Sequence, residues 1–128
     1  MVLEGAPPYR YLSSMTQRQT RDRRALAEAV QRALMAAPSA QHRIPDVAAE
    51  LGVSPFHLSR VFRTETGTTV HQYLLRIRMQ EALSRLRNEP RLSRLAHDLG
   101  FSSHSHFTET FRRHFGESPA QVRAALRG

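Results

Sequence analysis

The chain has 128 residues, of which 40% are hydrophobic, so it is long and apolar enough to bury one real core. It contains no cysteine, which excludes disulfides, thiolate zinc sites and cysteine nucleophiles. Its 19 basic residues, all of them arginine, exceed the 11 acidic residues and give a formal net charge of +8, which predicts association with a polyanion.

The N-terminal stretch, residues 1–20, contains one glycine and two prolines and shows no sustained apolar period. This pattern predicts a flexible tail or a linker. From residue 21 to Met35, apolar side chains recur at helical spacing. We therefore place the folded domain at residues 21–128.

A first helix-turn-helix pattern covers residues 45–66. Pro45 stands in a first turn, where proline is tolerated, and Gly52 supplies the sharp turn that follows. Ser54 and Pro55 then provide the cap and the first position of a second helix. Such a pair of helices is the layout of many DNA-reading motifs.

A long helix is predicted at residues 69–87, and a second helix-turn-helix pattern follows at residues 92–115. Its turn carries a glycine, and its second helix opens at Ser102 or Ser103. A serine-proline pair then starts a C-terminal helix at about 118–126.

The two patterns are copies of one another. The stretch 47–52 (VAAELG) matches the stretch 95–100 (LAHDLG), 48 residues later. The inward and terminal positions of the second helices also correspond, as Leu58, Phe62 and Gly67 match Phe107, Phe111 and Gly116. A repeated helix pair joined by a helix predicts two motifs of one kind in a single chain.

Three segments carry a family resemblance: GVSPFHLSRVFRTETG, QYLLRIRMQEAL and GFSSHSHFTETFRRHFGESPAQVR. They resemble the DNA-binding domain of AraC/XylS-type transcription regulators, over about residues 24–127. The resemblance implies an all-α fold of seven helices, with two helix-turn-helix subdomains joined by the long central helix. Many relatives carry a separate ligand-sensing domain, and residues 1–20 are too few to form one. The sequence leaves open whether the chain is a single-domain regulator or the C-terminal part of a longer sensor.

Helical spacing predicts which side chains face outward. With Leu58 and Phe62 inward, a phenylalanine and an arginine of the same helix face outward. Their side chains suit contacts with thymine methyls and guanine edges. The alternative is an exposed aromatic side chain beside a solvated arginine, with no role in binding. We predict base contacts from Phe56, Ser59, Arg60, His104, Ser105, Thr108 and Glu109. We predict phosphate contacts from the helix starts and arginines, namely Ser54, Arg63, Arg76, Arg78, Ser102, Arg112 and Arg113.

Glu109 occupies the position in the second copy that Arg60 occupies in the first. A carboxylate that faces DNA repels phosphate, so it must accept from cytosine N4 or orient a neighbouring basic group. The alternative is that the second copy reads little sequence and mainly grips the backbone. The sequence does not choose between these two readings.

These features predict a sequence-specific transcription regulator that reads two adjacent major grooves on one face of duplex DNA. They leave open whether it is an activator or a repressor. We expect a monomer on DNA rather than a dimer, with RNA polymerase as a second partner. The alternative is a helical protein-interaction module, with DNA binding incidental.

Several other classes of protein are not expected. No apolar run reaches membrane-spanning length and no signal-peptide pattern is present, so we expect a cytoplasmic protein without a membrane partner. His104 and His106 stand two residues apart and cannot share one helix face, so we expect no metal site. No paired carboxylates, phosphate-cradling glycine loop or nucleophile beside a base is found, so we expect neither an enzyme nor a cofactor.

Overall fold

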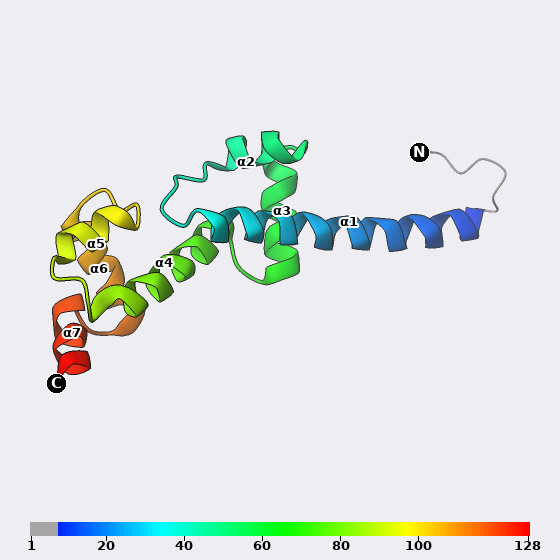
Figure 1. The fold of residues 1–128 in the computed structure, drawn as a ribbon. Coiled ribbons are helices and arrows are strands. Elements are labelled where there is room, and N and C mark those ends of the chain that lie inside the picture. The colour runs from blue at the N-terminus through cyan, green and yellow to red at the C-terminus, as the bar shows by residue number, and fades with distance from the viewer. Residues whose placement is uncertain (1–7) are drawn as a thin grey trace. The chain divides into compact units, whose positions relative to one another are not determined.

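The computed structural model describes residues 8–128, and this part of the chain contains seven helices and no strand (Figure 1). The all-α class and the seven helices predicted from the family resemblance are therefore confirmed. In chain order the helices are α1 (Pro8–Ala36), α2 (Ile44–Leu51), α3 (Pro55–Thr66), α4 (Val70–Leu86), α5 (Leu92–Asp98), α6 (His104–Phe115) and α7 (Pro119–Arg127).

Helix α1 begins much earlier than its periodicity indicated. The sequence predicted a flexible tail or a linker over residues 1–20 and a helix only from residue 21, whereas α1 begins at Pro8. Proline is tolerated in a first turn. No glycine or proline follows until Pro38, so nothing in the backbone stops the helix in between. Residues 1–7 lie outside the described residues.

The other helices lie where the sequence placed them, within one or two residues at each end. Helices α2 and α3 form the first helix-turn-helix motif, and α5 and α6 form the second. Helix α4 takes the place of the predicted central helix, and α7 that of the C-terminal helix. In the described part of the chain, no helix is both long enough and apolar enough to cross a lipid bilayer.

The chain divides into two compact units, each holding one motif. Unit 1 combines the α1 residues up to Arg32 with residues 43–70, and unit 2 combines residues 33–42 with residues 71–128. In unit 1 the buried apolar side chains come from α1, α2, α3 and the start of α4. They are Ala27, Val30, Val47, Ala48, Leu58, Val61, Phe62 and Val70.

Unit 2 has an aromatic core. Phe101, Phe107 and Phe111 form a chain of ring contacts, with centroids 5.3 and 5.8 Å apart. The four-residue spacing of phenylalanines on α6 supplies two of these rings, and Phe115 continues it with a centroid 4.6 Å from that of Phe111. Buried aliphatic residues of α4, α5 and the α5–α6 turn complete the cluster: Met79, Ala82, Leu86, Leu95, Ala96 and Leu99.

The turn glycines of the two motifs differ in their surroundings. Gly52 and Gly100 both adopt left-handed backbone, with φ of 71° and 88°, which favours glycine at each position. A Cβ added at Gly52 would meet no atom within 4 Å. A Cβ added at Gly100 would collide with the carbonyl oxygen of Ser39 and approach the guanidinium of Arg78. The segment before α2 therefore packs directly on the turn of the second motif.

Candidate nucleic-acid interface

Helix α3 is built to hold one face inward and present the other. The Ser54 hydroxyl accepts a hydrogen bond from the His57 backbone N–H at 3.1 Å, and Pro55 occupies the first turn. This cap fixes where the helix begins, and Leu58 and Phe62 are fully buried. The predicted outward side chains of α3 are all exposed: Phe56, Ser59, Arg60 and Arg63.

Phe56 and Arg60 form a pair on this exposed face. Phe56 is 71% exposed, which is unusual for a phenylalanine and leaves its ring in water. The Arg60 guanidinium carbon lies 5.6 Å from the ring centroid, within the range of a cation–π contact. This contact holds a flat apolar surface and a planar donor fork side by side. Such a pair suits a thymine methyl next to a guanine edge.

Helix α6 repeats the arrangement in unit 2. The Ser103 hydroxyl accepts from the His106 backbone N–H at 3.0 Å, so Ser103 is the cap. Of the two serines that the sequence offered, the structure therefore selects the second. Ser102 is exposed, and its hydroxyl lies 3.4 Å from Nδ1 of His106. The predicted phosphate-binding helix start is thus displaced by one residue.

Most of the predicted outward residues of α6 are exposed, namely His104, Ser105, Glu109 and Arg112. Thr108 is only half-buried, since it lies at the edge of the inward face beside the fully buried Phe107. The structure therefore leaves all seven predicted base-contacting residues accessible to some degree. Their contacts with bases stay a prediction.

Glu109 forms ion pairs with two arginines of its own helix. Its Oε1 lies 3.5 Å from Nη1 of Arg112, and its Oε2 lies 3.6 Å from Nη2 of Arg113. These ion pairs are exposed, so each contributes little to stability. They do orient two cations on the outer side of α6, which is one of the two roles that the sequence left open for this carboxylate.

Arg78 departs from the other predicted phosphate ligands. Its Nε donates to the Pro38 carbonyl at 2.7 Å and its Nη2 donates to the Ala40 carbonyl at 2.8 Å, while its guanidinium carbon lies 5.7 Å from the Phe101 ring centroid. Burial lowers the pKa of Arg78, although a guanidinium remains charged. We therefore assign Arg78 a structural role in unit 2, and its phosphate contact stays a prediction. The arginines that stay exposed are Arg63, Arg76, Arg112 and Arg113.

The sequence did not single out a second basic flank of α6. His106, Arg113 and His114 line a hollow of about 270 Å³ in unit 2, together with His71 of α4. These α6 residues, with Thr110 between them, are spaced so that they lie on one flank of the helix. This spacing could have predicted the flank from the sequence. Among the described residues, no group of three or more His, Asp or Glu side chains is arranged to hold a metal ion.

A family model for a helix-turn-helix domain matches residues 47–125, which is more than half of the chain. Among curated relatives, the chain is 36% identical over 83 residues to the HTH-type transcriptional activator RhaS of Escherichia coli O139:H28. The match covers 64% of this chain and 30% of RhaS, so the chain spans about a third of that relative's length.

Two solved structures share the fold. One is a transcriptional regulator from Chromobacterium violaceum, described as containing an AraC-type DNA-binding domain, with a TM-score of 0.68 and 28% identity over 83% of this chain and 93% of that one. The other is the DNA-binding domain of AdpA, a global transcriptional factor, in complex with a target DNA. It has a TM-score of 0.73 and 29% identity, and covers 79% of this chain and 92% of the AdpA domain.

Proposed function

The chain belongs to the AraC/XylS family of helix-turn-helix transcription regulators, and on that premise we propose that it binds duplex DNA in a sequence-specific manner through α3 and α6. The observation that carries the proposal is the exposed Phe56–Arg60 pair on α3. An aromatic ring left 71% exposed is costly in water and becomes favourable against the methyl groups of thymine.

Electrostatics supports the same partner. The formal charge of +8 attracts duplex DNA, and each neutralised phosphate releases counterions. The capped N-termini of α3 and α6 add unpaired backbone N–H groups, which suit phosphate oxygens. In this proposal Ser54 and Ser103 mark the phosphate-binding helix starts, and the exposed arginines of both motifs grip the backbone.

In this proposal the two motifs contribute differently to sequence preference and to affinity. Arg60 reaches guanine O6 and N7, and Phe56 lies against thymine. On α6, Ser105 and His104 contact base acceptors or phosphate, whereas Glu109 holds Arg112 and Arg113 toward the backbone. The first motif therefore supplies most of the sequence preference, and the second supplies affinity.

Two reading helices in one chain remove the need for a dimer to recognise a site of about two helical turns. We therefore propose that a monomer occupies two adjacent major grooves on one face of the duplex. Since RhaS is a transcriptional activator, the same role is proposed for this chain, with RNA polymerase as its further partner and the cytoplasm, where the chromosome lies, as its place of action.

Selection of bound duplexes from a random pool tests the proposal. The expected result is one asymmetric site of about two helical turns, bound with an affinity that falls steeply with salt. A palindromic site would instead indicate that the chain binds DNA as a dimer. Binding without any preferred sequence would overturn the proposal and favour a protein-interaction module, for which salt-insensitive binding to RNA polymerase is expected.

A further inference from the structure

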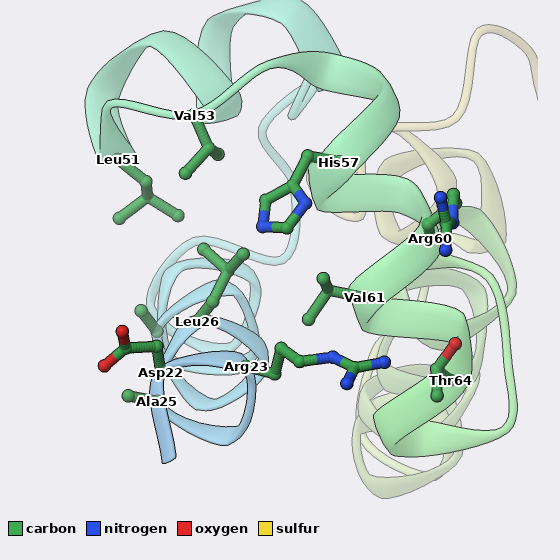
Figure 2. Close-up of a pocket in the computed structure, with 11 residues that line it drawn as sticks. Asp22, Arg23, Ala25, Leu26, Leu51, Val53, His57, Arg60, Val61 and Thr64 are labelled. Atoms are coloured by element: carbon green, nitrogen blue, oxygen red, sulfur yellow. The ribbon is translucent and has the colours of Figure 1, made fainter. Parts of the chain in front are cut away.

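Unit 1 contains a groove whose lining, apart from Arg60, takes no part in the proposed DNA contacts. The groove has a volume of about 820 Å³ and is bounded by α1, the turn after α2, and α3 (Figure 2). Pockets for small molecules are typically about 300–1,000 Å³ and are lined mainly by apolar side chains. The groove falls in this size range, and about half of its lining is apolar, formed by Ala25, Leu26, Ala29, Leu51, Val53 and Val61, while polar and charged side chains form the other half.

The apolar lining comes from all three bounding elements. Figure 2 shows the Leu26 side chain rising from α1 toward Val53 and His57, with Val61 of α3 facing the same space. Val61 is 4% exposed, so it forms the floor, whereas Leu26 and Val53 are half-buried walls. An apolar molecule in the groove would cover these walls, with a gain of about 25 cal/mol for each Å² removed from water.

A cation stands at one side of this apolar space. Figure 2 shows the Arg23 side chain extended from α1 toward α3, in the direction of Thr64, whereas the neighbouring carboxylate of Asp22 points to the opposite side. Among residues 22–128, whose side chains the structure describes, no ion pair or hydrogen bond engages the Arg23 guanidinium. A guanidinium in this setting favours a carboxylate, which it binds through two parallel N–H donors.

Other polar groups of the groove agree with an acidic ligand. His57 presents its imidazole to the space between Val53 and Val61, and Thr64 adds a hydroxyl. Arg60 lines the rim. The groove therefore offers donors and two arginines beside an apolar floor, and the one carboxylate that also lines it, that of Asp22, points away from the Arg23 side chain.

We propose that this groove binds a small organic acid with an apolar body. The carboxylate pairs with Arg23, and the body lies over Leu26, Val53 and Val61. A protein partner is disfavoured, because a stable protein interface buries about 800 Å² of surface on each partner. The surface that lines this groove is enough only for a single drug-sized molecule. An inorganic anion is disfavoured because it would leave the apolar walls in water.

The test uses 4-phenylbutyrate as the probe and nuclear magnetic resonance of the full chain without DNA. We expect saturable shifts of the Leu26, Val53 and Val61 methyl signals. The amide analogue, which lacks the charge, should bind about tenfold or more weakly, as expected for a lost charged hydrogen bond. Arg23→Gln should weaken binding of the acid by a similar factor. Arg24→Gln, an exposed arginine next to it that does not line the groove, is the matched control and should change nothing.

A second variant guards against an indirect effect. Ala29→Glu keeps Arg23 but places a carboxylate in the groove, so binding of the acid should be lost while thermal unfolding stays cooperative. The proposal is overturned if no saturable shift appears up to about 10 mM, the range of weak ligands. It is also overturned if the acid and amide bind equally, if Arg24→Gln weakens binding as much as Arg23→Gln, or if an acidic amphipathic peptide binds where the acid does not. Because no DNA is present, failure here leaves the proposed DNA-binding function untouched.

Discussion

The turn of the first helix-turn-helix motif is open to solvent, whereas the turn of the second is covered by a segment distant in sequence. Gly52 has no neighbour within 4 Å of an added Cβ, while Gly100 lies directly against the Ser39 carbonyl. The Arg78 guanidinium holds that segment in place by donating hydrogen bonds to the backbone carbonyls of Pro38 and Ala40. The two copies of the motif thus share the backbone conformation of the turn, but a substitution at the second turn would disturb more neighbouring atoms than one at the first.

The exposed faces of the two motifs differ as well. On α3, Arg60 is held by an aromatic ring and by no carboxylate of the described residues. On α6, the equivalent position is Glu109, which neutralises part of the charge of Arg112 and Arg113. This difference supports the proposal that α3 mainly reads bases and α6 mainly holds the backbone.

The largest expected effect concerns the two glycines. Gly52→Ala should cost about 1–2 kcal/mol of unfolding free energy, the penalty of left-handed backbone for an L-residue. Gly100→Ala should cost about 2–5 kcal/mol, because it adds overpacking against backbone to the same penalty. Urea unfolding followed by circular dichroism measures both. Equal losses would show that the segment before α2 does not cover the second turn.

The next effect concerns DNA affinity. Arg60→Ala should weaken binding to the selected duplex by about 1–3 kcal/mol, because a guanidinium bound to guanine is lost. Arg32→Ala, an exposed arginine of α1 in unit 1, is the matched control and should have a much smaller effect. The two affinities are compared by fluorescence anisotropy at one salt concentration. If both variants weaken binding alike, Arg60 supplies only charge and the comparison of α3 with α6 loses its basis.

A smaller effect of opposite sign is expected on α6. Glu109→Gln removes a carboxylate from the side of α6 that is proposed to face DNA and frees Arg112 and Arg113, so affinity should rise by a few-fold at low salt. The dependence of log affinity on log salt should steepen. A loss of affinity confined to duplexes with one particular cytosine would instead show that Glu109 reads a base.

The smallest expected effect is a pH dependence of stability in unit 2. A hydrogen bond from the Arg85 guanidinium, at 2.9 Å, lowers the pKa of the Asp98 carboxyl. A lowered folded-state pKa means that this contribution to stability is complete above the ordinary aspartate pKa of about 3.9 and is lost as pH falls through the lowered value.

Asp98→Asn should therefore lower the unfolding midpoint at neutral pH, and the difference from the unsubstituted chain should vanish in acid. Glu50, the equivalent residue of the first motif, makes no ion pair with the described residues, so Glu50→Gln should leave the neutral-pH midpoint unchanged. A constant difference between Asp98→Asn and the unsubstituted chain at all pH values would contradict the assigned pairing.

Most of the fold could be predicted because local signals mark it. Glycine turns, serine–proline caps and the phenylalanine period of α6 each act over a few residues. The start of α1 was missed because an early glycine and prolines suggested a tail, although nothing after Pro8 stops a helix. The role of Arg78 could not be predicted, since its partners Pro38 and Ala40 lie about 40 residues away in sequence.

The outward faces of α3 and α6 followed from 100° spacing alone, and the exposure of Phe56 and Arg60 agrees with it. Spacing could not reveal that Glu109 contacts both Arg112 and Arg113, because that depends on side-chain conformation. Nor could it reveal the groove beside α3, which is assembled from residues of three separate elements.

The most direct test of the central claim is selection from a random duplex pool, performed in parallel with the unsubstituted chain and with Arg60→Ala. We expect the unsubstituted chain to select one asymmetric site, and Arg60→Ala to lose preference at one or two base pairs in one half of that site while the other half is retained. Unchanged preference at every position, or preference lost across both halves together, would contradict the claim that α3 supplies most of the sequence preference from a groove of its own.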